Sequence, residues 1–300
     1  MRELTRIRPE VRNRLVVRFG PGVLAWCDEL PGLVSKLAAR WNLDPVTAGS
    51  GGTSRVFRCV TRDRGTPVWL KLTPDPMIAR EETEALKTWA MTPLAVTLLA
   101  QDVTIDALLL EAVEPGEQVR ERAWTLPAVA ALLRDLRAPS PAVDEHSAVR
   151  PLTHRIEFVF DLTGRRLAAA DMSSPTALAM LCSARAAAWE LAAGGPVGLV
   201  HGDLHPGNVL SGPGDRLVAI DPRPAWGDPD FDTVDWVLDS ATDRTVLDSR
   251  IAELAAQVPG MSPDRVLSWC RALAPAIAIP RLCAGRDDAQ TLFLTTLANG

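Results

Sequence analysis

The chain has 300 residues, with 37 acidic and 32 basic side chains and a formal charge of −5. Apolar residues make up 47% and charged residues 23%, the composition of an ordinary globular protein. The length suggests about two domains, and the acidic balance disfavours a nucleic-acid or membrane-surface protein that binds through bulk positive charge. Because the chain has no Tyr, no mechanism here can use a tyrosine acid, base or nucleophile.

The five cysteines are scattered and include no C-x-x-C pair, so they predict neither a disulfide framework nor a zinc site. The first 15 residues are charged throughout and lack the apolar core of a signal peptide. No run of about 18 apolar residues occurs, and the apolar stretch 272–279 contains Pro275. We therefore expect a cytoplasmic protein with reduced thiols.

The first third of the chain predicts a helical start followed by a β-hairpin. Residues 30–41 place Leu33, Leu37 and Trp41 on one helical face. A glycine-rich loop, 49–54, then opens into strands 55–61 and 67–73, joined by a turn at Gly65. In the second strand, alternation puts Lys71 on the face opposite Val68, Leu70 and Leu72.

The remaining elements are predicted to be mostly helical. Residues 80–90 form a helix with acids in its first turn, and 105–113 form a strand that ends before Pro115-Gly116. Helices follow at 126–137 and 175–193, with a loop at 138–149. We expect an N-terminal lobe at 1–110, a hinge at 111–115 and a helical C-terminal lobe at 116–300.

Residues 199–232 carry the chemistry, in the order strand, polar loop, strand, turn, strand, acid. Asp203 and Asn208 share the loop, five residues apart, and Asp221 follows the last strand. Phosphoryl transfer needs an acid to orient and deprotonate the attacking hydroxyl, and oxygen ligands for Mg²⁺ on the phosphates. The stretch H-G-D-L-H-P-G-N matches the kinase pattern H-R-D-L-x-x-x-N except that Gly202 replaces the Arg.

HGDLHPGNVL followed by IDP resembles the aminoglycoside phosphotransferase branch of the protein-kinase-like fold. The extended IDPRPAWGDPDFD, with REETEAL and ELPGLVSKLAARW, is similar to the streptomycin 6-phosphotransferase and hydroxyurea phosphotransferase group. The resemblance covers about residues 30–238. It implies an α+β, two-lobed fold with a β-rich N-lobe and a mostly helical C-lobe, and ATP and Mg²⁺ in the cleft between the lobes.

The resemblance also implies roles for individual residues. Asp203 would be the catalytic base, and Asn208 and Asp221 the metal ligands. Lys71 would contact the nucleotide phosphates and pair with Glu82, with Glu84 in reserve. The remaining implied contacts are these: the phosphate loop at Gly51, Gly52, Thr53 and Ser54; adenine at the hinge backbone of Glu111, Ala112 and Val113; and Asp232 as a buried anchor of the catalytic loop.

Some residues depart from the family pattern. The loop 49–54 reads G-x-G-x-x-S, with Ser54 where the phosphate-loop pattern G-x-G-x-x-G has its third glycine. Pro222 stands where protein kinases have the Phe of D-F-G, and a proline has a fixed φ, so a flipping switch is not expected. Nothing supports regulation by activation-loop phosphorylation.

Alternative interpretations stay open at this point. His201-x-Asp203-x-His205 could belong to a metallohydrolase, but His146 and His154 lie in no recognisable ligand pattern. We expect His201 and His205 to shape the loop. A non-catalytic nucleotide-binding relative is disfavoured by the intact set of Lys71 and the loop residues.

The acids from Asp228 to Asp243 form helix caps and solvated surface, or a negative rim for a cationic substrate. In the second case Asp235 and Asp239, four residues apart, would bind guanidinium groups, with Trp226 as a wall. We expect an ATP- or GTP-dependent, Mg²⁺-requiring kinase of a cationic aminoglycoside, with streptomycin first. Hydroxyurea, a peptide antibiotic, a sugar or an amino alcohol are the alternatives. No nucleic-acid, membrane or protein partner is expected.

Overall fold

The computed structural model describes residues 3–49, 54–138 and 147–299. The chain divides into two compact units, residues 1–116 (unit 1) and 117–300 (unit 2). Each unit is described separately below.

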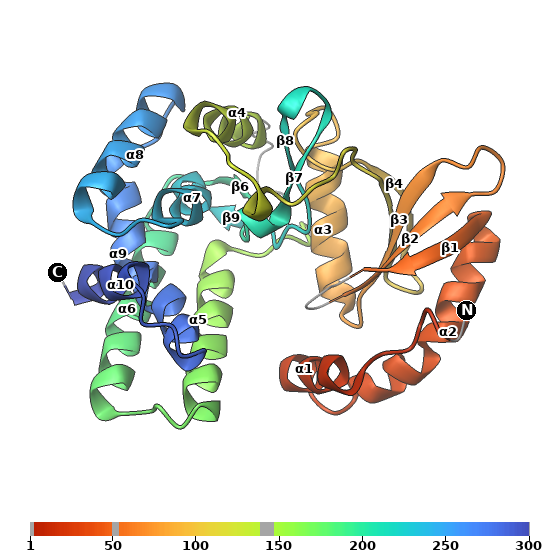
Figure 1. Ribbon diagram of the computed structural model, residues 1–300, viewed down its shortest axis with the longest axis horizontal. Helices are drawn as coiled ribbons and strands as arrows, with labels where there is room; N and C mark the ends of the chain where they lie inside the picture. The colour runs from red at the N-terminus through yellow and green to blue at the C-terminus, as the bar shows by residue number, and fades with distance from the viewer. Residues whose placement is uncertain (1–2, 50–53, 139–146, 300) are drawn as a thin grey trace. The chain divides into compact units, whose positions relative to one another are not determined.

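Unit 1 is built around a five-stranded antiparallel sheet in the order β1-β2-β3-β5-β4 (Figure 1). Its elements are α1 (Pro9–Phe19), α2 (Val23–Arg40), β1 (Leu43–Ala48), β2 (Arg55–Thr61), β3 (Pro67–Leu72), α3 (Pro76–Thr88), β4 (Leu98–Asp102) and β5 (Ala107–Glu111). The predicted hairpin is therefore confirmed as β2–β3, and β1 is an additional strand that Pro45 hides in the sequence.

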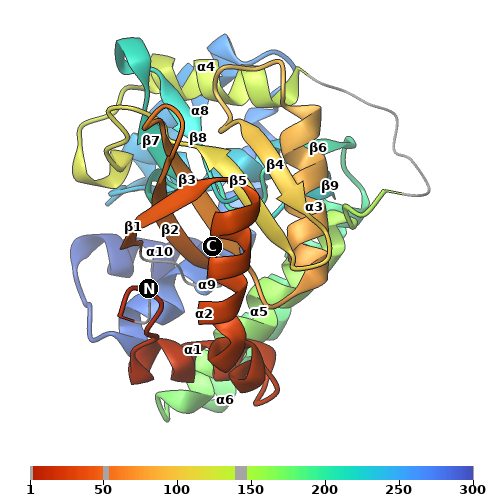
Figure 2. The same cartoon turned by 90° about the vertical axis from the view of Figure 1, so that its right-hand side faces the viewer.

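The two faces of this sheet carry different helices. Val68, Leu70 and Leu72 of β3 are buried in a core shared with α1 and α2. Lys71 points from the opposite face and bonds Glu82 of α3. Figure 2 looks onto α2, which lies across the sheet. The alternation of β3 thus separates an apolar face from a face that carries a charged pair.

Helix α3 begins earlier than the sequence predicted. Asp75 caps it by accepting a hydrogen bond from the backbone N–H of Met77 at 3.0 Å, and Pro76 occupies the first helical position. Glu82 therefore lies in the second turn, and the predicted first-turn placement of these acids is wrong.

Unit 2 is mostly helical. Its elements are η1 (Val119–Glu121), α4 (Leu126–Arg137), α5 (Leu152–Ala169), α6 (Pro175–Ala193), β6 (Gly198–Val200), η2 (Pro206–Asn208), β7 (Val209–Ser211), η3 (Pro213–Asp215), β8 (Leu217–Ala219), β9 (Ala225–Gly227), η4 (Pro229–Thr233), α7 (Val234–Leu238), α8 (Arg244–Gln257), α9 (Pro263–Cys283) and α10 (Ala289–Asn299). Helices α4 and α6 have the predicted bounds. Strand β6 pairs with β9 and β7 with β8, so two short antiparallel ladders hold the polar loop between them.

Helix α9 runs through Pro275 and Pro280. It is the one helix in the described ranges that is long and apolar enough to cross a membrane, and half of its apolar window is buried inside the protein. Trp269 and Cys270 on this helix are fully buried. These features are those of the central core helix of unit 2.

Candidate active site

A buried carboxylate anchors the loop that follows β6. Asp232, in η4, accepts the backbone N–H of His201 at 2.6 Å and that of Gly202 at 2.9 Å. Burial raises the pKa of Asp232 to about 6, and the two N–H donors act in the opposite direction. Together with the 2.8 Å bond from Arg223 N to His201 O, this arrangement fixes the backbone immediately before Asp203.

Gly202 is required by its surroundings. Its φ is +75°, and a Cβ at this position would lie 1.9 Å from the carbonyl oxygen of Arg223. No other residue fits without moving the backbone. The glycine that replaces the kinase Arg therefore permits close contact between the loop and the segment after β8.

His201 has a structural environment. It is 1% exposed, and its Nε2 lies 3.1 Å from the carbonyl oxygen of Ile220. Burial lowers the pKa of His201 to about 4, so the ring is neutral at physiological pH. His205 caps η2, because its Nδ1 accepts the N–H of Gly207 at 3.0 Å.

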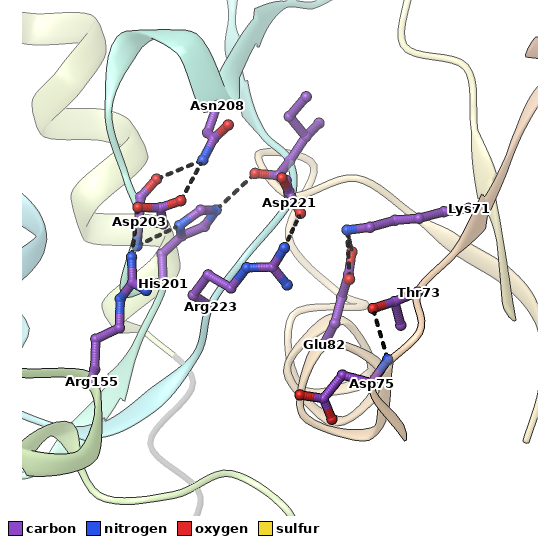
Figure 3. Close-up of polar contacts among 11 residues, drawn as sticks. Lys71, Thr73, Asp75, Glu82, Arg155, His201, Asp203, Asn208, Asp221 and Arg223 are labelled. Atoms are coloured by element: carbon purple, nitrogen blue, oxygen red, sulfur yellow. Dashed lines mark hydrogen bonds and ion pairs between the residues drawn. The ribbon is translucent and has the colours of Figure 1, made fainter. Parts of the chain in front are cut away.

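Two side chains hold the Asp203 carboxylate (Figure 3). Arg155 of α5 donates through one guanidinium nitrogen to Oδ1 at 2.7 Å, and its Nε donates to the carbonyl oxygen of Gly202 at 2.8 Å. The amide of Asn208 donates to Oδ2 at 3.1 Å and to the backbone oxygen of Asp203 at 3.0 Å. Each carboxylate oxygen keeps a lone pair, and a third of the side-chain surface remains exposed.

The Asp203 carboxylate is ionised at neutral pH. Burial alone raises its pKa, but the positive charge of Arg155, with smaller effects from His205 and Arg223, holds the pKa below its ordinary value. An aspartate of this kind is a weak base and a strong hydrogen-bond acceptor. It is suited to orienting a hydroxyl and to receiving its proton late in a reaction.

Asn208 and Asp221 can supply oxygen ligands for a metal. Ile220 N donates to Asn208 O at 2.9 Å, which places Asp221 one residue beyond this contact. Because the Asn208 nitrogen is committed to Asp203, its Oδ1 is the atom left to bind a cation. The Asp221 side chain is 35% exposed and lies 3.3 Å from the Arg223 guanidinium. A carboxylate and an amide oxygen are the hard donors that Mg²⁺ prefers, so the residues fit the expected ion.

Unit 1 contains a second charged pair. The Nζ atom of Lys71 lies 2.6 Å from both carboxylate oxygens of Glu82. Lys71 is 4% and Glu82 0% exposed. Of the two acids considered, Glu82 is therefore the one whose carboxylate accepts hydrogen bonds from Lys71, and it does so through both oxygens.

The other predicted nucleotide contacts are placed as follows. Gly51, Gly52 and Thr53 lie outside the described residues. Ser54 is 3% exposed at the entry to β2. Glu111 ends β5 and its side chain accepts the backbone N–H of Thr97 at 2.8 Å; Val113, two residues on, is half-buried.

The predicted substrate residues differ in their surroundings. The carboxylate of Asp235, in α7, has no hydrogen bond to any residue that the structure describes. Burial raises its pKa, and His205, Asp203 and Arg155 are among the charges that act on it. Asp239 accepts the indole N–H of Trp124 at 3.3 Å. Trp226, by contrast, is 8% exposed and donates its N–H to Ser147 at 3.0 Å, which leaves little of its ring available.

Arg155 was missed by the sequence analysis. It lies in an ordinary amphipathic helix, 48 residues before the aspartate it contacts. One signal was available: the absent Arg of H-R-D meant that any cation at this loop had to come from another element. Within ranges 3–49, 54–138 and 147–299, no group of three or more His, Cys, Asp or Glu side chains is arranged to hold a metal ion.

Comparison with known proteins agrees with this geometry. Residues 40–280 match the family described as aminoglycoside/hydroxyurea antibiotic resistance kinase. The chain is 31% identical to a streptomycin 6-kinase of Streptomyces glaucescens over 267 residues, 84% of this chain and 82% of the relative. It is 30% identical to a hydroxyurea phosphotransferase of Kitasatospora aureofaciens over 249 residues, 80% of this chain and 69% of the relative.

Solved structures show the same fold. A choline kinase from Streptococcus pneumoniae aligns with a TM-score of 0.60 and 14% identity over 90% of this chain and 99% of its own. The ternary complex of APH(2")-IIa with streptomycin and ATP aligns with a TM-score of 0.53 and 15% identity over 90% of this chain and 96% of its own. The predicted fold class and phosphotransferase activity are thereby confirmed, and the chain belongs to the aminoglycoside/hydroxyurea antibiotic resistance kinase family.

Proposed function

We propose that this kinase transfers the γ-phosphate of ATP to a hydroxyl group of a streptomycin-type aminoglycoside. The observation that carries the proposal is the Asp203 carboxylate, ionised and held at both oxygens by Arg155 and Asn208. Such a carboxylate can accept a hydrogen bond from a substrate hydroxyl without changing its side-chain conformation. The relatives named streptomycin 6-kinase supply the substrate class.

In the proposed reaction Asp203 accepts a hydrogen bond from the acceptor hydroxyl and orients its oxygen toward the γ-phosphorus. A new P–O bond forms as the bond between the γ-phosphorus and the β–γ bridging oxygen breaks. The electron pair leaves with ADP, and the hydroxyl proton passes to Asp203. Because phosphoryl transfer has a loose transition state, orientation contributes more than basicity, which suits an aspartate of lowered pKa.

Nucleotide binding is assigned to unit 1. Lys71, whose ammonium group is fixed by its hydrogen bonds to Glu82, donates to the phosphates of ATP. Gly51, Gly52, Thr53 and Ser54 are the proposed phosphate contacts of the glycine-rich segment. The backbone of Glu111 and Val113 binds the purine, and GTP could use the same two positions.

Asn208 Oδ1 and the Asp221 carboxylate hold Mg²⁺. When bound, the ion neutralises charge on the phosphates. The chain itself contributes the orientation of both ligands: Asn208 is turned by its two bonds to Asp203, and Asp221 lies beside Arg223.

Asp235 and Asp239 form the substrate-binding carboxylates of this proposal. Streptomycin carries two guanidinium groups, and carboxylates bind guanidinium through paired hydrogen bonds. Asp235 has no hydrogen-bond partner among the described residues, and the raised pKa of this half-buried acid falls when a cation approaches. A hinge at 111–115 and a cytoplasmic location complete the proposal.

The test is phosphorylation by the purified protein with ATP and Mg²⁺ across streptomycin, other aminoglycosides, hydroxyurea and simple sugars. Asp203→Asn is the catalytic variant, and Asp161→Asn, at an exposed ion pair with Arg185, is the matched control. We expect the control to equal wild type and Asp203→Asn to lose at least about 100-fold in kcat on streptomycin. Full activity of Asp203→Asn would remove the catalytic assignment.

Hydroxyurea is the second candidate substrate, because a hydroxyurea phosphotransferase is 30% identical over 80% of this chain. Hydroxyurea is small and uncharged, so its phosphorylation would not depend on the carboxylates of Asp235 and Asp239. A higher kcat/KM on hydroxyurea than on streptomycin, unchanged in Asp235→Asn and Asp239→Asn, would replace the aminoglycoside proposal. The assignment of kinase activity would stand.

A further inference from the structure

Unit 1 contains a cavity of about 780 Å³ between the N-terminal segment and β1. Its walls come from residues 3–14, from β1 and from the first residue of β2. Gly49 and Arg55, the residues on either side of segment 50–54, both line it. The cavity therefore lies beside the ends of β1 and β2 that the glycine-rich segment joins.

The cavity is strongly basic. Its described lining includes Arg6, Arg8, Arg14 and Arg55, and the one acid among these lining residues is Glu3. Two other arginines of unit 1 form ion pairs: Arg12 bonds Asp28 at 2.9 Å and Arg62 bonds Asp44 at 2.9 Å. None of the four guanidinium groups of the cavity has a hydrogen bond or ion pair with any residue in the described parts of the chain.

Arg55 is the most informative of the four. It is 7% exposed, and its Nε is buried without a hydrogen-bond acceptor. Burial, together with the positive charges of Arg8 and Arg14, lowers its pKa. A buried guanidinium without an anionic partner destabilises the protein, and the three further arginines of the cavity add electrostatic repulsion to that cost. Arginine is the residue that best combines partial burial with paired donors to phosphate or carboxylate.

The arginines of the cavity lie on the other side of the sheet from Lys71. Arg55 pairs with Leu72 across β2 and β3, so both side chains leave the same face of the sheet. Leu72 lies in the core shared with α1 and α2. Val56 pairs with Lys71, whose side chain leaves the opposite face toward Glu82 of α3. A ligand of Arg55 and a ligand of Lys71 would thus lie on opposite faces of one sheet.

We infer that this cavity is a second binding site, specific for a small anion that carries phosphate groups. Four guanidinium groups against one carboxylate match a ligand with several negative charges. The buried Arg55 supplies the fixed donor at the inner end. Arg6, Arg8 and Arg14, which are exposed, close on the ligand from the solvent side. A phosphorylated metabolite or free pyrophosphate has this chemistry.

The site does not depend on the phosphotransfer proposal, so its test uses binding and not activity. Pyrophosphate is titrated calorimetrically into the intact chain carrying Lys71→Met and Glu82→Gln, which removes the charged pair of the opposite face. We expect one binding event with an affinity at least tenfold higher than that for sulfate. Equal affinity for sulfate would overturn the assignment to phosphate.

The arginines are then tested in the same background. Arg8→Gln with Arg14→Gln alters exposed side chains and is expected to weaken pyrophosphate binding at least tenfold. Arg55→Met is expected to abolish it. The control is Arg62→Gln. Arg62 is an exposed arginine directly after β2, and its replacement should leave the affinity unchanged. Binding that survives in the Arg8/Arg14 double variant, or that is lost equally in Arg62→Gln, would refute the site.

Discussion

Replacement of Arg155 tests whether the guanidinium orients Asp203, the proposed catalytic base. Arg155→Met removes the 2.7 Å bond to Asp203 Oδ1 and the 2.8 Å bond to the Gly202 carbonyl, and keeps the apolar stem of the side chain. Asn208 then holds the carboxylate alone. Arg155→Lys is the conservative variant, because a lysine can reach one of the two acceptors but cannot bridge them.

The size of the effect follows from the two bonds. Hydrogen bonds to charged groups contribute about 1.5–3 kcal/mol each. The Asp203 side chain is 33% exposed, so water replaces part of what is lost and the sum must be discounted. A loss of about 1.4–2.7 kcal/mol in the transition state corresponds to a fall of about 10- to 100-fold in kcat.

The assay is steady-state kinetics with streptomycin and ATP. We expect kcat to fall in Arg155→Met, KM for ATP to stay within about twofold, and Arg155→Lys to recover part of the loss. Arg185→Met, which removes an exposed pair with Asp161, is the control. If Arg155→Met kept kcat within twofold of wild type while thermal denaturation showed it folded, the orienting role would be refuted.

The pH dependence gives a second readout. Asp203 has a pKa below its ordinary value of 3.8, in spite of burial, largely because of Arg155. Without that charge, burial dominates and the pKa rises, so the acidic limb of kcat/KM should move to higher pH. For stability, a lowered folded pKa contributes above the unfolded value of about 3.8 and is lost as the pH falls below it. The stability difference between wild type and Arg155→Met should shrink in that acidic range.

Three further predictions use matched variants. Gly202→Ala places a Cβ against a backbone carbonyl oxygen and should lower the free energy of urea unfolding by more than about 3 kcal/mol. Gly214→Ala, with φ +67° and no atom within 4 Å of the added Cβ, should lower it by about 1–2 kcal/mol. Equal losses in the two variants would contradict the contact at Gly202. Lys71→Met should destabilise by about 3–5 kcal/mol because Glu82 loses its buried cation, and adding Glu82→Gln should restore stability but not activity, as thermal denaturation and kinetics will show. Asp235→Asn should raise KM for streptomycin about tenfold and leave that for ATP unchanged; an unchanged streptomycin KM would exclude this carboxylate from the substrate site.

Local patterns predicted the elements whose side chains repeat regularly. In β3 the core residues Val68, Leu70 and Leu72 recur at every second position. Helices α4 and α6 are capped by the side chains of Thr125 and Ser174, and each has a proline within its first two helical positions. The motif HGDLHPGN located the loop with its polar residues, because its spacing is set by contacts within five residues.

Other elements depend on contacts that no local pattern records. Strand β1 contains Pro45 and has a bulge between Pro45 and Thr47, yet it pairs with β2 at the sheet edge. Helix α9 contains Pro275 and Pro280 and is kept by burial in the core of unit 2. The Arg155–Asp203 pair joins residues 48 positions apart, and only the folded chain brings them together.

The acidic run shows most clearly why residue type alone does not determine role. Asp228 is fully buried and binds the indole N–H of Trp269 at 2.6 Å, whereas Asp243 caps α8 through the N–H of Val246 at 3.0 Å. Both carboxylates are committed to holding the fold.

Asp235 lies in the same run and is half-buried, but its carboxylate has no hydrogen bond from the described residues, and the charges that act on it include His205 and Asp203 of the loop after β6. A carboxylate kept partly from water without a donor is destabilising in the free protein. That cost is offset when a cation binds. We therefore propose Asp235 as the carboxylate of this run that recognises the substrate.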